Sequence, residues 1–368
     1  MLKRILPVVL VICLLLCACA SEAEPGETSV ETTAAPVTEA TAVATQQTTA
    51  PAKETMDVTT APTEATAPVE DSQLRNPLNG QPMDEEYSGR VFSVVINNIE
   101  SALPLRGINN ADLFFEMYVN GHATRGLAFF SDVTDLQAAG SVRSFRQNFA
   151  DLCFAYDAIV LHAGNGHYAK GLDHLNANEG IGFRDNERYK KLGYNWENTL
   201  FASGEDLINA ATKKNYELER SGRDYGLRFA EDGTPVDGEN ATEIEIVMTH
   251  DGATKRNILK YDETLGKYIF WQYGEEQIDE NTGETIRFEN VIVMFAEVKN
   301  VDVYHIADLN TTGEGYYACG GKIVPIKWSH ENQEDPITFT LEDGTPLKQG
   351  VGSTYISIAP TGSPVSYQ

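Results

Sequence analysis

The first 86 residues contain no phenylalanine, tyrosine or tryptophan, and the first aromatic residue is Tyr87. Residues 20–75 are rich in threonine, alanine, proline and glutamate instead. Such a segment buries too little apolar surface to offset the entropy that it would lose on folding. We therefore expect residues 20–75 to form a disordered stalk, with a glycosylated threonine-rich stalk as the alternative.

Basic residues are scarce as well. The chain has 28 lysines and arginines against 54 aspartates and glutamates, which gives a formal net charge of −26. A surface this acidic repels the phosphates of nucleic acids and of anionic lipid headgroups. The composition therefore argues against nucleic acid as a partner and against attachment to a membrane through a basic patch.

Cysteine is rare, and three of the five cysteines lie within residues 13–19. Two basic residues, Lys3 and Arg4, precede the apolar run 5–16. That run is shorter than the about 20 residues that a membrane-spanning helix needs, and no later apolar run approaches this length. The pattern is typical of a secretory signal peptide, here residues 1–18.

The apolar run ends in Leu16-Cys17-Ala18-Cys19. A small residue directly before a cysteine, with leucine three residues before that cysteine, is the lipobox pattern of bacterial lipoproteins. It predicts that Cys19 becomes the first mature residue and carries a lipid that attaches the protein to the membrane. The expected location is the outer face of the cytoplasmic membrane. An ordinary secretory signal with incidental cysteines is the alternative interpretation.

The sequence from residue 76 predicts an α+β protein with two domains. Residues 76–230 mix strand and helix patterns and are expected to form an α/β domain. Residues 240–368 show strand patterns at short spacing and are expected to form a mainly antiparallel β domain, after a boundary within 221–240. The remaining cysteines, Cys153 and Cys319, are interpreted as buried free thiols rather than as a disulfide.

The α/β half predicts four strands and three helices. The Asn120-Gly121 pair indicates a hairpin, and Ser203 is a plausible N-cap. Strands are expected at 90–98, 113–118, 125–130 and 158–162, and helices at 141–156, 168–175 and 204–214. In the β half, strands are expected at 242–249, 256–261, 267–273, 285–297, 301–307, 315–328, 337–341 and 353–359.

A set of short motifs extends over nearly all of residues 76–368. They are Asn76-Pro77-Leu78-x-Gly80-x-Pro82, Val94-Val95-Ile96-x-Asn98, Ala111-Asp112, Glu116, Thr124-Arg125, Val142-Arg143-Ser144-x-Arg146, Tyr261-Asp262-x3-Gly266-Lys267-Tyr268, Asp279-x2-Thr282-Gly283 and the hairpin 315–328. In combination they resemble the YerB-like lipoproteins, a bacterial and mostly Gram-positive family built on a domain of unknown function. The resemblance implies a two-domain surface protein and no particular activity. The family usually has His-x-Gly-Gly-Ser where this chain has His162-Ala163-Gly164-Asn165-Gly166-His167, so His167 is not a family residue.

The best candidate site is Arg143-Ser144-x-Arg146, at the start of the helix expected over 141–156. Two guanidinium groups, the Ser144 hydroxyl and free backbone N–H groups would suit a carboxylate, phosphate or sulfate. Arg125, at the start of a neighbouring strand, is expected to join them. The alternative is a structural network in which the arginines pair with Glu116, Asp112 or Asp151.

The second candidate lies at the ends of two expected strands. Ligands in open α/β sheets bind beyond the carboxyl ends of strands, and Asn97, Asn98 and His162 end such strands. Turn and cap chemistry at both strand ends is the favoured interpretation. A hydrolase or transferase of the cell envelope would use His162 as acid or base, with Glu116 or Asp151 as its partner.

No metal or cofactor is expected. His162, His167 and His174 lie close in sequence, but their spacing matches no metal-binding pattern. The leading hypothesis is therefore a surface protein that binds an anionic small ligand or a cell-envelope protein without catalysing a reaction. A hydrolase or transferase and a structural scaffold are the alternatives.

Overall fold

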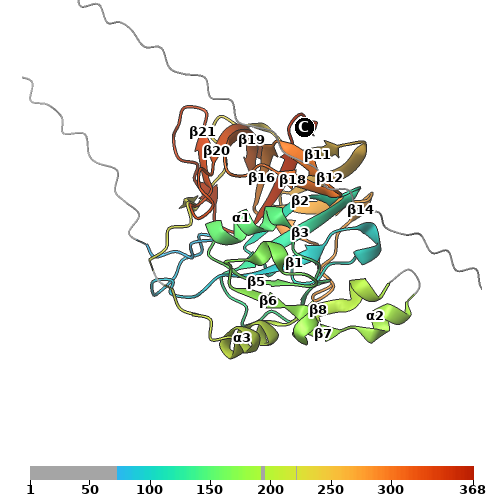
Figure 1. Ribbon diagram of the computed structural model, residues 1–368. Coiled ribbons are helices and arrows are strands. Elements are labelled where there is room, and N and C mark those ends of the chain that lie inside the picture. Colours follow the sequence, from blue (N-terminus) through green and yellow to red (C-terminus); the bar gives the residue numbers. More distant parts are fainter. Residues whose placement is uncertain (1–72, 192–194, 221) are drawn as a thin grey trace, which may run out of the picture. The chain divides into compact units, whose positions relative to one another are not determined.

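The computed structural model describes residues 73–191, 195–220 and 222–368 (Figure 1). The signal peptide, Cys19 and nearly all of the stalk lie outside these residues. The described residues form one compact unit. Among the described residues, no helix is long and apolar enough to cross a membrane. The predicted α+β class is confirmed, because strands dominate and helices are few and short.

The largest sheet has eleven strands within the described residues. Its order is β10 (Glu239–Asn240), β20 (Lys322–Ser329), β19 (Thr312–Cys319), β16 (Asn290–Ala296), β23 (Thr354–Pro360), β2 (Leu113–Asn120), β3 (Ala123–Phe130), β1 (Phe92–Asn97), β5 (Ile159–His162) and β6 (His174–Asn176), with β21 (Thr338–Leu341) paired to β20. Strands β1 and β23 are buried along their whole length. Burial on both faces explains their nearly continuous apolar sequences.

Strand β23 joins the two halves of the chain. It pairs in parallel with β16 on one side and with β2 on the other. Strands from residues 92–162 and from residues 239–360 therefore share one hydrogen-bonded sheet. The division into domains 76–230 and 240–368 remains a prediction, and this shared sheet gives the two segments a common core.

A second sheet has six strands. Its order is β14 (Glu275–Glu276), β13 (Lys267–Gln272), β12 (Ala253–Asp262), β11 (Glu243–His250) and β24 (Val365–Tyr367), with β15 (Arg287–Phe288) paired to β13. Three small sheets are formed by β17 (Val298–Val301) with β18 (Tyr304–Ala307), β22 (Gln349–Gly350) with β9 (Phe229–Ala230), and β8 (Leu200–Ala202) between β4 (Ala139–Gly140) and β7 (Phe183–Arg184).

Two hydrophobic clusters cover the two faces of the large sheet. On one face, Phe114 and Ile96 pack with residues of the six-stranded sheet such as Ile246. On the other face, Val95 and Leu127 pack with helix α1 (Gln147–Ala155), which lies over strands β1 to β3 (Figure 1). Because side chains alternate along a strand, each residue of β1, β2 and β3 can be assigned to the α1 face or to the sheet face.

The remaining helices are short. The α-helices are α2 (Asn186–Lys190) and α3 (Gly204–Lys213), and the 3-10 helices are η1 (Glu100–Ala102), η2 (His167–Ala169), η3 (Ala177–Glu179) and η4 (Trp196–Thr199). Ser203 caps α3 as predicted, in a capping box with Asp206. Cys153 and Cys319 are buried and free, as expected.

Two of the helix predictions need correction. The helix expected over 168–175 is wrong, because only η2 is helical, Gly171 has a positive φ of 91° and residues 174–176 pair with β5. The helix expected over 141–156 begins only at Gln147. Residues before it are extended, with Val142 bridged to Ile96 and Ser144 bridged to Ala163.

Candidate functional site

The arginine motif lies at one edge of the large sheet. Strands β1 and β5 are parallel neighbours, so their carboxyl ends meet at this edge. Strand β3 is antiparallel to β1 and therefore begins there, with Arg125 opposite Asn97. The extended segment 141–144 runs between the two strand ends, where Arg143 N donates to Val95 O and Ala163 N donates to Arg143 O. This topology brings the predicted residues Arg125, Arg143 and Arg146 together.

Arg125 is the most buried of the three arginines. Leu127 and Phe129 contact the α1 side, and strand alternation places Arg125 on the same face. Its side chain is 4 % exposed, and Nη1 donates to Ser144 O at 2.5 Å. Its Nε atom has no hydrogen-bond partner among the described residues. Burial, together with the positive charges of Arg146 and Arg143, lowers the pKa of Arg125 to about 9.

Arg146 is half-buried beside two tyrosines. Its guanidinium lies over the ring of Tyr304, 4.9 Å from the centroid, and Tyr168 meets Tyr304 edge to face. Nη1 donates to Phe145 O, and within the described residues Nε has no partner. Burial lowers the pKa of Arg146, with Arg143 contributing in the same direction.

Arg143 alone of the three arginines has an ion pair in the part of the chain that the structure describes. Its Nη1 lies 2.7 Å from Oε2 of Glu197, whose side chain is 63 % exposed. Its buried Nε lacks a partner there as well. The three guanidinium groups thus share one exposed carboxylate. A cluster with this charge and with three unused donors has the chemistry to bind a carboxylate, phosphate or sulfate.

The carboxylates proposed as structural partners of the arginines have other contacts. Asp112 accepts from Asn79 Nδ2 and from Ser131 N. Asp151 accepts from Gln333 Nε2 at 2.7 Å. Neither is ion-paired with an arginine of the cluster in the described residues, so the structural network expected as the alternative is absent there.

Glu116 points to the opposite face of the sheet, between the two sheets. It is fully buried, and its Oε1 lies 3.4 Å from Lys255 Nζ. Thr124, Asn257 and Tyr355 donate hydrogen bonds to its two oxygens. Glu116 therefore belongs to a polar network that ties the large sheet to β12.

Asn98 also belongs to this network and not to the arginine cluster. Its Oδ1 accepts from Gln272, and its backbone oxygen accepts from Lys255 and Tyr273. The backbone of Asn98 lies at the same sheet edge as His162, as predicted, but the Asn98 side chain points toward the six-stranded sheet. Asn97 is the asparagine next to Arg125, and it donates to Asn198.

His162 is fully buried and pairs with another histidine. Its Nε2 lies 3.0 Å from Nδ1 of His174, and its Nδ1 lies 3.2 Å from Ala163 O. Because a carbonyl only accepts, His162 Nδ1 carries hydrogen and His174 Nδ1 donates to His162 Nε2. Burial lowers the pKa of both histidines.

The contacts of His162 give no support to acid–base chemistry. Glu116 and Asp151, its proposed partners, are held by Lys255 and Gln333 as described above. The ring of His167 meets that of Tyr168 edge to face. Within residues 73–191, 195–220 and 222–368, no group of three or more His, Cys, Asp or Glu side chains could hold a metal ion.

Ser144 lies beside the turn that follows His162. A Cβ atom on Gly164, whose φ is 79°, would lie 3.1 Å from Ser144 Oγ. Glycine is therefore needed at this turn both for its backbone conformation and for the close approach of Ser144. The Ser144 hydroxyl faces the His162 loop, and its backbone oxygen holds Arg125.

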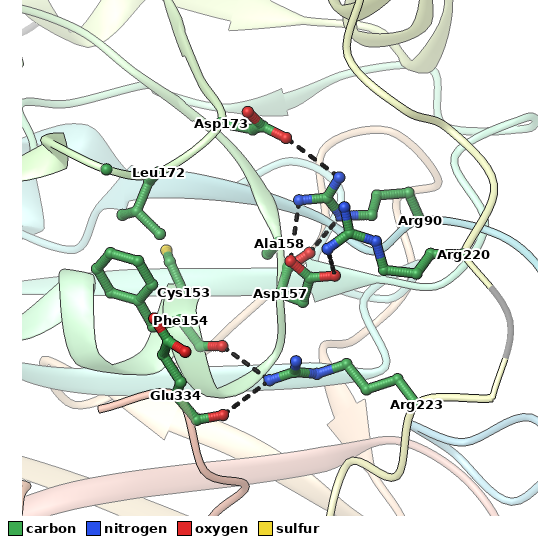
Figure 2. A pocket seen from close by; sticks show the side chains of 11 residues that line it. Arg90, Cys153, Phe154, Asp157, Ala158, Leu172, Asp173, Arg220, Arg223 and Glu334 are labelled. Atoms are coloured by element: carbon green, nitrogen blue, oxygen red, sulfur yellow. Dashed lines mark hydrogen bonds and ion pairs between the residues drawn. The ribbon is translucent and has the colours of Figure 1, made fainter. Parts of the chain in front are cut away.

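A separate cavity of about 320 Å³ contains three more arginines (Figure 2). Figure 2 shows Arg90 and Arg220 converging on Asp157, with Asp173 on the other side of Arg90. The distances are 3.0 Å from Arg90 to Asp157, 3.1 Å from Arg90 to Asp173 and 2.5 Å from Arg220 to Asp157. These charges neutralise one another.

Arg223, in the same cavity, holds the end of helix α1. Its Nη2 donates to the backbone oxygens of Phe154, Ala155 and Glu334. A cation at the carboxyl end of a helix is favourable, because the last carbonyl oxygens carry partial negative charge. The cavity is thus accounted for by ion pairs and helix capping, and the cluster of Arg125, Arg143 and Arg146 is the better candidate for binding.

Sequence reasoning missed the residues around the arginine cluster. Glu197 and Tyr304 lie 54 and 158 positions from Arg143 and Arg146 in the chain, within η4 and β18. Nothing local in the sequence connects them. Asn97 is different, because it was expected at the strand end together with Asn98, and alternation from the buried Val95 places it on the α1 face.

Comparisons with known proteins agree with this architecture. Two family models match, described as the N-terminal domain of a protein of unknown function (DUF3048), residues 78–217, and its C-terminal domain, residues 244–356. The chain is 25 % identical over 297 residues to "Putative lipoprotein YerB" of Bacillus subtilis (strain 168), covering 78 % of this chain and 87 % of that protein. A crystal structure of YerB from Bacillus subtilis matches with a TM-score of 0.68 and 24 % identity over 80 % of this chain and all of that one. The predicted resemblance is confirmed, and the chain belongs to the DUF3048 family, with both of its domains present in one polypeptide.

Proposed function

We propose that this protein is a lipid-anchored surface protein that binds an anionic ligand through Arg125, Arg143 and Arg146. The attachment rests on the lipobox at Cys19 and on the lipoprotein name of the relative from Bacillus subtilis. The same features support the location that we propose, which is the outer face of the cytoplasmic membrane on a Gram-positive cell surface. An anchored protein of this kind meets ligands of the cell envelope.

One observation carries the binding proposal. Arg125 is a buried arginine with no carboxylate partner among the described residues, beside two further arginines. An unpaired buried charge costs several kcal/mol, and this chain has almost twice as many acids as bases available to neutralise one. An anion that reaches the cluster supplies the missing charge and the acceptors for the free Nε groups.

The test is a thermal unfolding titration with sodium phosphate, sulfate and acetate. It uses the full-length protein in a non-ionic detergent, so that the detergent brings no competing anion. At a ligand concentration of 100 times Kd, binding stabilises the folded state by about 2.7 kcal/mol. We expect at least one anion to raise Tm in the wild type and to leave the double variant Arg143→Ala/Arg146→Ala unchanged.

The matched control removes two arginines that already have partners. Arg228 pairs with Asp224 and Arg256 pairs with Glu245, both on the surface. The variant Arg228→Ala/Arg256→Ala changes the net charge by the same amount and should keep the full response to the anion. Equal responses in all three proteins would refute the arginine cluster as the binding site.

A further inference from the structure

A second feature next to the arginine cluster points to the class of the ligand. Tyr189 and Trp196 are among the few large apolar side chains exposed to solvent, with exposed fractions of 49 % and 48 %. Their rings meet edge to face with centroids 5.4 Å apart. We call Tyr189, Trp196 and the neighbouring Arg184 the aromatic platform.

Arg184 gives the platform a positive charge. Its guanidinium lies over the Trp196 ring, 4.3 Å from the centroid, and Nη1 donates to Trp196 O at 2.7 Å. Within the described residues Arg184 has no ion pair with a carboxylate. It thus shares with Arg125 and Arg146 the property of being an arginine without an acidic partner in a strongly acidic chain.

The platform adjoins the arginine cluster through the chain itself. Trp196 is followed directly by Glu197, whose carboxylate contacts Arg143 at 2.7 Å. Within the cluster, Arg146 lies on Tyr304, which Tyr168 meets edge to face. The arginine cluster therefore contacts a tyrosine ring at Arg146 and, at Glu197, the residue next to Trp196 in the chain. A ligand that contacts the cluster and the platform carries both negative charge and flat apolar faces.

We propose that the ligand is an anionic glycan, whose charged groups bind the arginine cluster while a sugar ring stacks on Trp196. The C–H-rich face of a pyranose ring is flat and apolar, and its rim carries hydroxyl groups. An exposed indole covers such a face, whereas the arginines bind phosphate or carboxylate groups on the same chain. This inference rests on the proposed anion site and adds the platform to it.

The alternative occupant is the anionic surface of a lipid bilayer, which also combines charge with apolar groups. A bilayer would face a wide area of a protein whose net charge is −26, and that charge repels it. A single glycan chain contacts only the region where the arginines gather. Charge complementarity therefore favours the glycan.

The experiment compares an anion that contains sugar rings with an anion that contains none. Isothermal titration of the full-length protein in non-ionic detergent uses an oligogalacturonate, a linear chain of sugar acids, and tripolyphosphate, which has no ring. Trp196→Ala should weaken oligogalacturonate binding about three- to tenfold, the loss expected for one aromatic stacking contact, and leave tripolyphosphate binding unchanged. Trp196→Phe, which keeps a ring, should retain most of the affinity.

Leu265→Ala is the matched control, because Leu265 is equally exposed, at 47 %, in the turn between β12 and β13. It should bind both anions as the wild type does. Equal affinity of wild type and Trp196→Ala for oligogalacturonate would overturn the glycan proposal and leave the anion site standing. The same holds if Trp196→Ala weakens both anions equally, since that indicates a structural role.

Two further outcomes separate the proposals. If the wild type binds neither anion, both the anion site and the glycan proposal fail. Glycerophosphoglycerol, the water-soluble headgroup of an anionic lipid, serves as the third probe. If it binds more tightly than oligogalacturonate and its affinity is the same in Trp196→Ala, the ligand is a headgroup and the glycan proposal is wrong.

Discussion

The buried pair of Glu116 and Lys255 allows a quantitative test of the packing between the two sheets. Glu116 has no exposed surface, and the Lys255 side chain is 3 % exposed. Glu116→Gln keeps the size of the side chain but removes its charge, so the Lys255 ammonium loses its counter-ion. Breaking one partner of a buried ion pair costs about 3–5 kcal/mol, which lowers Tm by roughly 6–15 °C.

The hydrogen bonds make the glutamine a poor replacement. Oε2 of Glu116 accepts from both Asn257 Nδ2 and Tyr355 Oη, and Oε1 accepts from Thr124 Oγ1. A side-chain amide has only one acceptor oxygen, so its NH2 group must face one of these sets of donors. This conflict puts the expected loss toward the upper end of the range.

Urea unfolding of four proteins measures the coupling between the two residues. They are the wild type, Glu116→Gln, Lys255→Met and the double variant. Each single change leaves one buried charge or its acceptors uncompensated, whereas the double change removes both charges. We expect the double variant to lose less free energy of unfolding than the sum of the two, by about 1–3 kcal/mol. Additive losses would show that the pair is not coupled, and the assignment of Glu116 to this network would be wrong.

Three further predictions concern the arginine edge and the cysteines. Burial lowers the pKa of His162 and His174, so at acidic pH the unfolded chain binds more protons than the folded protein does. The free energy of unfolding should therefore fall as pH drops below about 6.5. Between pH 7.5 and pH 5, Tm should fall less in His174→Asn than in the wild type. Arg125→Met should raise Tm by a few degrees in anion-free buffer, since removing an uncompensated buried charge contributes about 1–4 kcal/mol, and should abolish the response to anions; a lower Tm would show that the charge is compensated. Burial raises the pKa of the Cys153 thiol to about 12 and also raises that of Cys319, so iodoacetamide should label neither in the native protein and both in guanidinium chloride, as read by peptide mass spectrometry.

The sequence predicted the secondary structure correctly where the signal lies within a few neighbouring residues. The Asn120-Gly121 hairpin, the Ser203 cap and the strands of the β half follow from turn chemistry, capping and periodicity. The helix expected over 168–175 failed because its apolar spacing resembles a helix, while Gly171 and pairing with β5 decide the backbone. Tertiary pairing overrides a weak local preference.

The candidate site likewise contains residues that could be predicted from the sequence and partners that could not. Arg125, Arg143 and Arg146 could be named from their residue type and from the expected strand ends, and the parallel pairing of β1 with β5 brings them together. The partners of Glu116 could not be predicted, because Lys255 lies on a strand of the other sheet. Sequence periodicity gives the face of a strand but does not identify the layer that covers that face.

The two buried charges of the large sheet differ in a way that bears on function. On the sheet face, Glu116 is matched by Lys255 and by three hydrogen-bond donors, so its charge is balanced within the fold. On the α1 face, Arg125 is equally buried but lies beside two other cations and has no acidic partner in the described part of the chain. The same fold thus neutralises one buried charge and provides no acidic partner for the other among the described residues. If packing alone governed this edge, a neutral residue in place of Arg125 would be more stable, and a bound anion is the partner that we propose for this charge.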